Sequence, residues 1–257
     1  MHLVANRLSS SNFWAWIAVP GSEAPLPCPV RIEEAPRRLR VGDVCTVRST
    51  QVMVHAVSIC PDAQGMLHQL VACRITSGRL AQGASTVELA RPGLAVAVVT
   101  LSDKGSRGER EDTSGPAVLE LLQDSLSVTT HAMVVIPDDA PTLKRYLMDL
   151  CLVQGFDLVV TSGGTGVAPR DITPEVTLAA IERRLPGLET AMMLAALQKT
   201  PHAALSRAVA GTLGESIVLN LPGSPKAVRE NLAAVVSALP HAIAKLQGDE
   251  SDCGSKH

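Results

Sequence analysis

The stretch TSGGTGVAPRDITPE (161–175) combines residue types that are suited to binding phosphate. Its three glycines follow a strand-like run, and glycine permits positive φ and close approach of a bound molecule to backbone N–H groups. Hydroxyl groups lie beside them, so the candidate anion-binding residues are Thr161, Ser162, Gly163, Gly164, Thr165 and Gly166. The stretch lacks the P-loop lysine and the GxGxxG spacing. An ordinary strand-to-helix turn is an equally good interpretation of this stretch taken alone.

Two aspartates, Asp138 and Asp171, stand near this stretch in the predicted fold. A carboxylate beside bound phosphates repels them unless a cation intervenes, and Mg²⁺ binds one or two carboxylates together with phosphate oxygens. The alternative is that Asp138 caps a helix beginning near Pro141 and that Asp171 caps one beginning at Thr173. Taken together with the glycine-rich stretch, the pair favours magnesium-assisted nucleotidyl transfer, with both aspartates as catalytic metal ligands.

Further polar or small residues follow the other predicted strands and are candidate contacts for substrate or nucleotide. They are Ser102, Asp103, Arg170, Pro222, Gly223, Ser224 and Pro225. Each has a structural alternative. Ser102 or Ser224 can cap a helix, and Arg170 can pair with Asp171.

From residue 93 onward, apolar strand-like runs alternate with segments of helical period. The predicted strands are 93–102, 131–137, 156–162 and 216–223, and the predicted helices are 115–126, 141–155, 173–185 and 224–239. In the third helix, Thr173 is the expected N-cap and Pro174 the first helical residue. This alternation predicts an α/β fold with a parallel sheet covered by helices on both faces. Ligands of such sheets bind beyond the carboxyl ends of the strands, where all the candidate residues fall.

Residues 1–90 have a different pattern, with short β-branched segments bounded by proline and glycine. Strands are expected at 13–19, 39–49, 52–59 and 67–75, which suits a small, mostly β domain such as a barrel. We assign no chemistry to this part and expect its histidines and cysteines (His55, Cys60, His68 and Cys73) to face a core. The predicted domains are therefore 1–90, 91–248 and a disordered tail at 249–257.

Composition excludes several classes of protein. The net charge is −2 without a basic patch, which argues against binding to nucleic acid or to a membrane surface. The longest apolar run, 93–101, is too short to span a membrane, and the N-terminus does not resemble a signal peptide. The six cysteines form no CxxC pair, so reduced thiols in a cytoplasmic protein are expected.

Several long stretches, in order, carry a family resemblance over about residues 94–248. They are TLSDKGSRGEREDTSGP, VIPDD, TSGGTGVAPRDITPE, LPGLETAM, TPHAALSRAVAG, LNLPGSPKAVRE and ALPHAI. This part resembles the MogA/MoaB family of molybdopterin adenylyltransferases and the G domain of gephyrin. The resemblance places the family's two essential aspartates on Asp138 and Asp171, its GGTG loop on Gly163–Gly166 and its PGSP loop on Pro222–Pro225.

The resemblance implies a three-layer, parallel-sheet molybdopterin-binding domain with a specific activity. Members transfer AMP from Mg·ATP to the terminal phosphate of molybdopterin and release pyrophosphate. They are commonly trimers, and their product passes to a molybdenum-insertion enzyme. Two alternatives stay open, which are a non-catalytic molybdopterin-binding carrier or scaffold and a CinA-like nucleotide hydrolase. Asp138 and Asp171 favour the enzyme.

Overall fold

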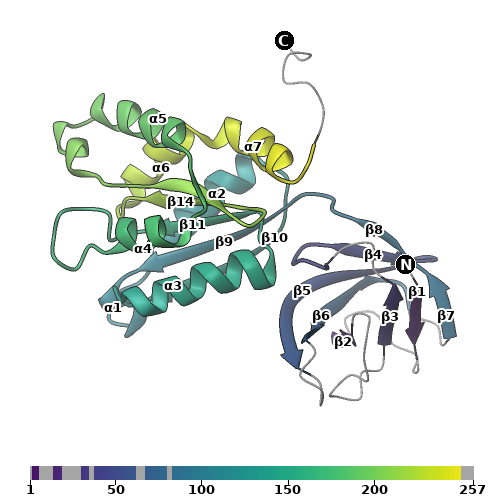
Figure 1. The fold of residues 1–257 in the computed structure, drawn as a ribbon. Helices are drawn as coiled ribbons and strands as arrows, with labels where there is room; N and C mark the ends of the chain where they lie inside the picture. The colour runs from purple at the N-terminus through teal and green to yellow at the C-terminus, as the bar shows by residue number, and fades with distance from the viewer. Residues whose placement is uncertain are drawn as a thin grey trace, which may run out of the picture. The chain divides into compact units, whose positions relative to one another are not determined.

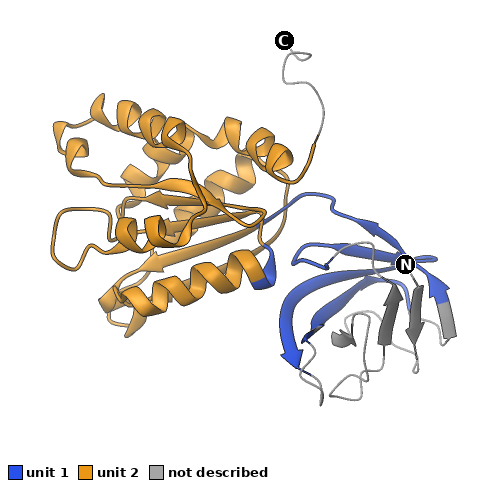
Figure 2. Ribbon diagram, viewed as in Figure 1, with its two compact units in different colours: residues 1–95, 153–155 blue, residues 96–152, 156–257 orange. Residues whose placement is uncertain are grey.

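The computed structural model describes residues 2–5, 14–18, 30–34, 38–61, 67–79 and 83–249. The chain divides into two compact units (Figure 2). One comprises Met1–Ala95 with Val153–Gly155, and the other comprises Val96–Leu152 with Phe156–His257. The domain boundaries drawn from the sequence stay predictions, and the predicted disordered tail lies outside the described residues except for Asp249.

The first unit is a sheet of eight strands in the order β7-β1-β3-β2-β6-β5-β4-β8. The strands are β1 (His2–Ala5), β2 (Trp14–Ala18), β3 (Val30–Glu34), β4 (Val44–Val47), β5 (Thr50–Pro61), β6 (Leu67–Ser77), β7 (Gly83–Thr86) and β8 (Glu88–Ala90). Neighbours are antiparallel except β2 and β3. The two edge strands, β7 and β8, are separated in the chain by Val87 alone, so one continuous segment joins both edges, as in a barrel. The small β domain predicted from the sequence is confirmed.

The core of this unit contains one buried ion pair and two buried thiols. The Asp43 side chain is fully buried, and Arg91 Nη1 donates to its Oδ1 at 2.8 Å. Cys45 and Cys73 are buried free thiols, and burial together with the nearby Cys45 raises the pKa of Cys73 well above its usual value. The Cys73 thiol is therefore neutral, and metal binding by Cys73 would require opening the core.

The second unit is built on a six-stranded sheet in the order β10-β9-β11-β14-β13-β12. Its strands are β9 (Leu94–Leu101), β10 (Val128–Ile136), β11 (Leu158–Ser162), β12 (Arg183–Arg184), β13 (Ala210–Leu213) and β14 (Ser216–Leu221). β11 pairs in parallel with β9 and β14, which confirms the predicted parallel core. β13 is antiparallel to both β14 and β12, an edge that the strand–helix alternation did not predict.

Helices cover both faces of this sheet, as expected for the predicted α/β class. They are α1 (Asp103–Ser106), α2 (Ser114–Ser125), α3 (Ala140–Met148), α4 (Thr173–Ala180), α5 (Pro186–Leu197), α6 (Pro225–Ala233) and α7 (Leu239–Leu246), with a π-helix η1 (Asp149–Gln154) and two 3₁₀ helices, η2 (Pro201–Leu205) and η3 (Val236–Ala238). Figure 1 shows α3 and α4 on one side of the sheet and α6 and α7 on the other. None of the helices in the described residues is long and apolar enough to cross a membrane.

Two predicted helix ends were wrong, each for a physical reason. The helix expected at 173–185 ends at Ala180, because Glu182 and Leu185 donate their N–H groups to β13. The helix expected at 224–239 ends at Ala233, and α7 begins anew with Pro240 in its first turn, where its missing N–H does no harm. The helix expected at 141–155 is α3 continued by η1.

Candidate active site

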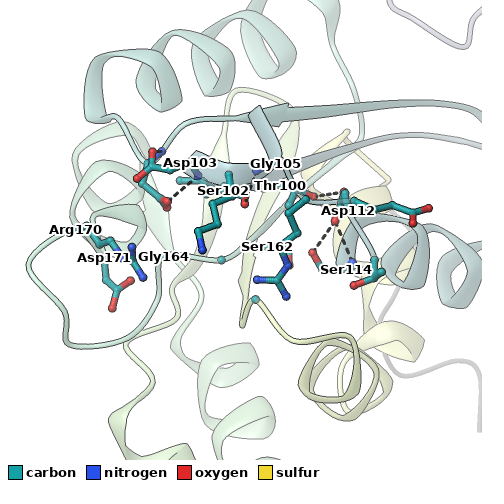
Figure 3. Close-up of a pocket in the computed structure, with 18 residues that line it drawn as sticks. Thr100, Ser102, Asp103, Gly105, Asp112, Ser114, Ser162, Gly164, Arg170 and Asp171 are labelled. Carbon is teal, nitrogen blue, oxygen red and sulfur yellow. Dashed lines mark hydrogen bonds between the residues drawn. The ribbon is translucent and has the colours of Figure 1, made fainter. Parts of the chain in front are cut away.

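A cavity of about 310 Å³ in the second unit lies where β9, β10 and β11 end (Figure 3). It brings together most of the residues proposed from the sequence. They are Ser102, Asp103, Asp138, Ser162, Gly163, Gly164, Arg170, Asp171 and Gly223. The rest of the lining was not proposed and comprises Thr100, Leu101, Lys104, Gly105, Arg110, Glu111, Asp112, Thr113 and Ser114.

The glycine-rich turn packs directly against the two aspartates. Gly164 has φ +63°, and a Cβ there would lie 2.5 Å from Thr173 Oγ1 and 3.5 Å from Asp138 Oδ1. A Cβ at Gly166 would lie 2.7 Å from Asp171 Oδ2. These glycines therefore leave room for both carboxylates to approach the main chain, in addition to making the turn.

The turn offers fewer free N–H groups than the sequence suggested. Gly163 donates its N–H to Leu221 O at 3.0 Å, so that group is already used. The N–H groups of Gly164, Thr165 and Gly166 have no acceptor among the described residues. Thr173, expected as an N-cap, lies instead within the first turn of α4, and its Oγ1 donates to Gly163 O at 2.9 Å.

Asp138 is not a helix cap, so the structural alternative for this residue was wrong. The neighbouring Asp139 caps α3 by accepting from Thr142 N at 2.9 Å. Asp138 and Asp103 instead exchange hydrogen bonds, at 3.1 Å from Asp138 N to Asp103 Oδ1 and at 3.3 Å in return. Burial is the main cause that raises the pKa of Asp138. The hydrogen bond from the Asp103 N–H and the Arg170 charge oppose this rise, and the Asp103 and Asp171 charges add to it.

Asp171 is not a helix cap either. The capping position of α4 is Ile172, which makes no side-chain cap bond. Asp171 Oδ2 accepts from Ala168 N at 2.8 Å within its own loop. Its Oδ1 accepts no hydrogen bond from any described residue, which leaves one oxygen open for a ligand.

The two carboxylates fit a magnesium ion that arrives with a phosphate ligand. Among the described residues, no group of three or more histidine, cysteine or carboxylate side chains could hold a metal. Mg²⁺ does not need such a cage, because it typically uses one or two carboxylates, phosphate oxygens and water. The pKa of Asp138 is raised mainly by burial and to a smaller extent by the Asp103 and Asp171 charges, and a bound cation would favour the charged carboxylate.

A second polar group on the far wall of the cavity was missed by sequence reasoning. Thr100 Oγ1 donates to Asp112 Oδ2 at 2.7 Å, while Asp112 Oδ1 accepts from Ser114 N, Ser114 Oγ and Gly115 N, each at 3.0 Å. Figure 3 shows this group across the cavity from Gly164, Arg170 and Asp171. The acidic residue just before the helix-starting SGP motif was the available signal.

Three cations line the same cavity: Lys104, Arg110 and Arg170. None of them forms an ion pair in the part of the chain that the structure describes. They face the carboxylates of Asp103, Glu111, Asp112, Asp138 and Asp171, which line the same cavity. The site therefore combines unpaired positive charges suited to phosphate with carboxylates suited to a divalent cation.

Several proposed contacts do not line the cavity. They are Thr161, Thr165, Gly166, Pro222, Ser224 and Pro225. Thr161 is buried, and its Oγ1 accepts from Asn220 Nδ2 at 2.9 Å. Ser224 caps α6 by accepting from Ala227 N at 3.2 Å, and Pro225 begins that helix. In the structure these residues support the loops, and a direct role for them in binding stays a prediction.

Comparison with known proteins places this site in a family. Residues 97–241 match the model of a probable molybdopterin binding domain. Molybdopterin adenylyltransferase of Helicobacter pylori J99 is 37% identical over 163 residues, covering 63% of this chain and 93% of that protein. The Haemophilus influenzae enzyme of the same name is 41% identical over 143 residues, covering 55% and 73%.

A solved structure agrees with these matches. The molybdopterin biosynthesis enzyme MoaB of Thermus thermophilus is 48% identical, with a TM-score of 0.56 over 61% of this chain and 98% of that one. The match falls on the α/β unit that carries the cavity, and it confirms the resemblance seen in the sequence. The chain belongs to the MogA/MoaB-like family of molybdopterin-binding domains.

Proposed function

We propose that this protein is a molybdopterin adenylyltransferase, which transfers AMP from Mg·ATP to the terminal phosphate of molybdopterin and releases pyrophosphate. The observation that carries the proposal is that Asp138 and Asp171 line one cavity together with the Gly163–Gly164 turn, and that the same cavity also holds three cations without an ion pair among the described residues. The names of the bacterial relatives support the same activity.

The reaction is a substitution at phosphorus that needs no strong base. A terminal phosphate oxygen of molybdopterin attacks the α-phosphorus of ATP, a new P–O bond forms, and the bond to the leaving pyrophosphate breaks. The attacking phosphate is already ionised at neutral pH. The protein therefore has to align the two phosphates and offset their mutual repulsion.

The described residues divide this work between two walls of the cavity. Gly164 presents an unused N–H beside Asp138, where a triphosphate oxygen can accept it. Arg170 and Lys104 neutralise phosphate charge. On the opposite wall, the first N–H groups of α2 are already bonded to Asp112, and the Thr100–Asp112–Ser114 group shapes this side of the cavity.

Asp138 and Asp171 would hold the Mg²⁺ that accompanies ATP. Bound there, the ion would supply charge neutralisation at the bridging phosphate oxygens. The two residues approach the glycine turn from different loops. Their fixed positions would determine where the triphosphate sits.

The remaining features of the proposal follow from the family resemblance. We propose a cytoplasmic homotrimer whose adenylylated product passes to a molybdenum-insertion enzyme. The sequence offers no basic patch for nucleic acid or membrane partners. Sedimentation of the full chain would test the trimer.

Pyrophosphate release by the purified chain tests the activity directly. The assay contains molybdopterin, ATP and Mg²⁺, and it compares wild type with Asp138→Asn and Asp171→Asn. Either substitution removes a proposed metal ligand and should lower turnover by about 100-fold or more. Asp139→Asn is the matched control, because this neighbouring carboxylate caps α3 and does not line the cavity.

The outcomes separate the candidate functions. Release by wild type and by Asp139→Asn, with loss in the other two variants, supports the adenylyltransferase. Tight molybdopterin binding without pyrophosphate release would instead indicate the carrier or scaffold. Hydrolysis of a nucleotide without molybdopterin would indicate the CinA-like alternative.

A further inference from the structure

Arg207 holds the loop that carries Asp171, although it does not line the cavity. This residue lies just after η2, far along the chain from the loop. Its backbone N–H donates to Thr165 O at 2.9 Å. Its side chain then donates from Nε to Gly166 O at 2.7 Å and from Nη2 to Asp171 O, also at 2.7 Å.

These bonds span the base of the loop. Gly166 and Asp171 are its first and last residues, so a single guanidinium fixes the separation between the loop ends. The third donor, Nη1, pairs with Glu175 in the first turn of α4 and ties the same group to the helix. The residues between the ends are exposed, with Val167 66% exposed, so core packing contributes little to holding them.

Contacts within this loop position the carboxylate of Asp171. Asp171 Oδ2 accepts from Ala168 N, and Asp171 N donates to Ala168 O at 2.9 Å. Both contacts move with the loop, whereas the bonds from Arg207 come from outside it. The position of the Asp171 side chain relative to Asp138 therefore depends on Arg207.

We propose that Arg207 is a positioning residue for the transfer reaction, which sets the Asp171 carboxylate in place for the magnesium–nucleotide complex. This rests on the proposed function, since it takes Asp171 as a ligand. Only arginine fits the role, because its planar guanidinium group donates hydrogen bonds to two carbonyls and a carboxylate at once. Lysine has a single ammonium group in place of these three separate nitrogens.

The experiment compares wild type with Arg207→Lys, which keeps the charge, and Arg207→Ala, which removes it. Glu175→Gln keeps the bonds to the two carbonyls while removing the ion pair. Arg229→Lys is the matched control, because Arg229 makes one exposed ion pair, with Glu120, away from the cavity. Three quantities are measured: amide hydrogen exchange in peptides covering 166–172, Mn²⁺ affinity in the presence of ATP, and kcat and KM for pyrophosphate release.

We expect Arg207→Lys to speed exchange at 166–172 while peptides from β9 and α2 stay as in wild type. Mn²⁺ affinity should fall by about tenfold and kcat by about 100-fold, because a displacement near 1 Å is enough for such losses. KM for molybdopterin should stay within about twofold, since the bonds among Thr100, Asp112 and Ser114 on the far wall of the cavity do not involve Arg207. Glu175→Gln and Arg229→Lys should stay close to wild type in all three measurements.

Wild-type exchange in Arg207→Lys would overturn the proposal, and so would faster exchange with unchanged Mn²⁺ affinity. If Arg207→Ala does not fold, the lysine variant alone decides. The proposed function is judged separately, by whether wild type releases pyrophosphate at all. Hydrogen exchange and Mn²⁺ affinity test the role of Arg207 even if wild type releases no pyrophosphate.

Discussion

Asp103 and Asp138 are joined by reciprocal hydrogen bonds, in which the backbone N–H of each donates to the carboxylate of the other, at 3.3 and 3.1 Å. The pair links the start of α1 to the end of β10, so two negative charges lie close together at the cavity wall. Burial raises the pKa of Asp138, while the hydrogen bond from the Asp103 N–H lowers it and the Asp103 charge raises it to a smaller extent. The site is therefore held in a state that costs stability as long as no cation is present.

This cost predicts that Asp138→Asn stabilises the metal-free protein at neutral pH. A raised folded-state pKa contributes stability that is present below the unfolded value and is lost as pH rises through the folded value. At pH 7 the wild type has lost it, whereas asparagine never carries the charge. Thermal unfolding without Mg²⁺ should show a higher midpoint for Asp138→Asn, with the difference shrinking on acidification.

Asp139→Asn should not raise the unfolding midpoint in the same assay, in contrast to Asp138→Asn. Hydrogen bonds from Thr142 lower the pKa of Asp139, so its contribution is present at neutral pH and lost as pH falls through the folded value. This variant should never exceed wild type in midpoint at pH 7. Equal midpoints for wild type and Asp138→Asn at every pH would rule out the charge crowding.

Alanine at Gly166 should impair the site more than alanine at other glycines. Its Cβ would lie 2.7 Å from Asp171 Oδ2, which must move to make room. We expect turnover to fall by about 100-fold. Gly187→Ala in α5 is the control, since its Cβ meets nothing within 4 Å and should stabilise the helix by about 0.5–1 kcal/mol. Equal turnover of the two variants would contradict the packing argument.

Asp112→Ala should lower the free energy of unfolding by about 1–2 kcal/mol, because it removes the acceptor for the first N–H groups of α2 and for Thr100 Oγ1. Urea denaturation measures the change. The adjacent Glu111→Ala is a suitable control, because Glu111 is exposed and has no hydrogen-bond partner within the described part of the chain. If the two variants unfold at the same urea concentration, Asp112 does not cap α2.

Arg91→Met should destabilise the first unit strongly. It leaves the fully buried Asp43 carboxylate without the guanidinium that donates to it at 2.8 Å. Breaking a buried pair by removing one partner costs about 3–5 kcal/mol. Arg107→Met breaks the exposed pair with Glu109 and should leave stability close to that of wild type, because water and salt screen an exposed pair. Urea titration of both variants would reveal whether burial makes the difference.

The central sheet was predictable because β9, β11 and β14 are continuous apolar runs, which only a sheet covered on both faces requires. The antiparallel edge of the sheet was not predictable, because β12 consists of two arginines, which have no sequence pattern typical of a strand. Those residues pair because β13 offers acceptors at Thr212 and Ala210, a tertiary effect that local patterns do not contain.

The candidate site shows the same division. Taken singly, a helix cap was the better interpretation of Asp138 and of Asp171, and only the glycine-rich stretch suited to phosphate made a metal role the preferred prediction. Which of two neighbouring aspartates caps α3 depends on backbone geometry, and Asp139 has the extended conformation that a cap requires. Thr161 was assigned to the ligand, but it is buried and bonds to Asn220, because alternate residues of a strand point to opposite faces.

The short edge strand β12 has a consequence for how copies of this protein meet. An exposed sheet edge with a long row of unpaired N–H and C=O groups invites pairing with another chain. Here that edge is only Arg183 and Arg184, which present two charges of the same sign and little backbone. A second molecule that approached this edge would gain few hydrogen bonds and would meet the charge of Arg183, while Arg184 is paired with Glu189 within the same chain. Fibril-like growth through the β12 edge is therefore disfavoured, which protects one side of a sheet whose interior strands are among the most apolar segments of the chain.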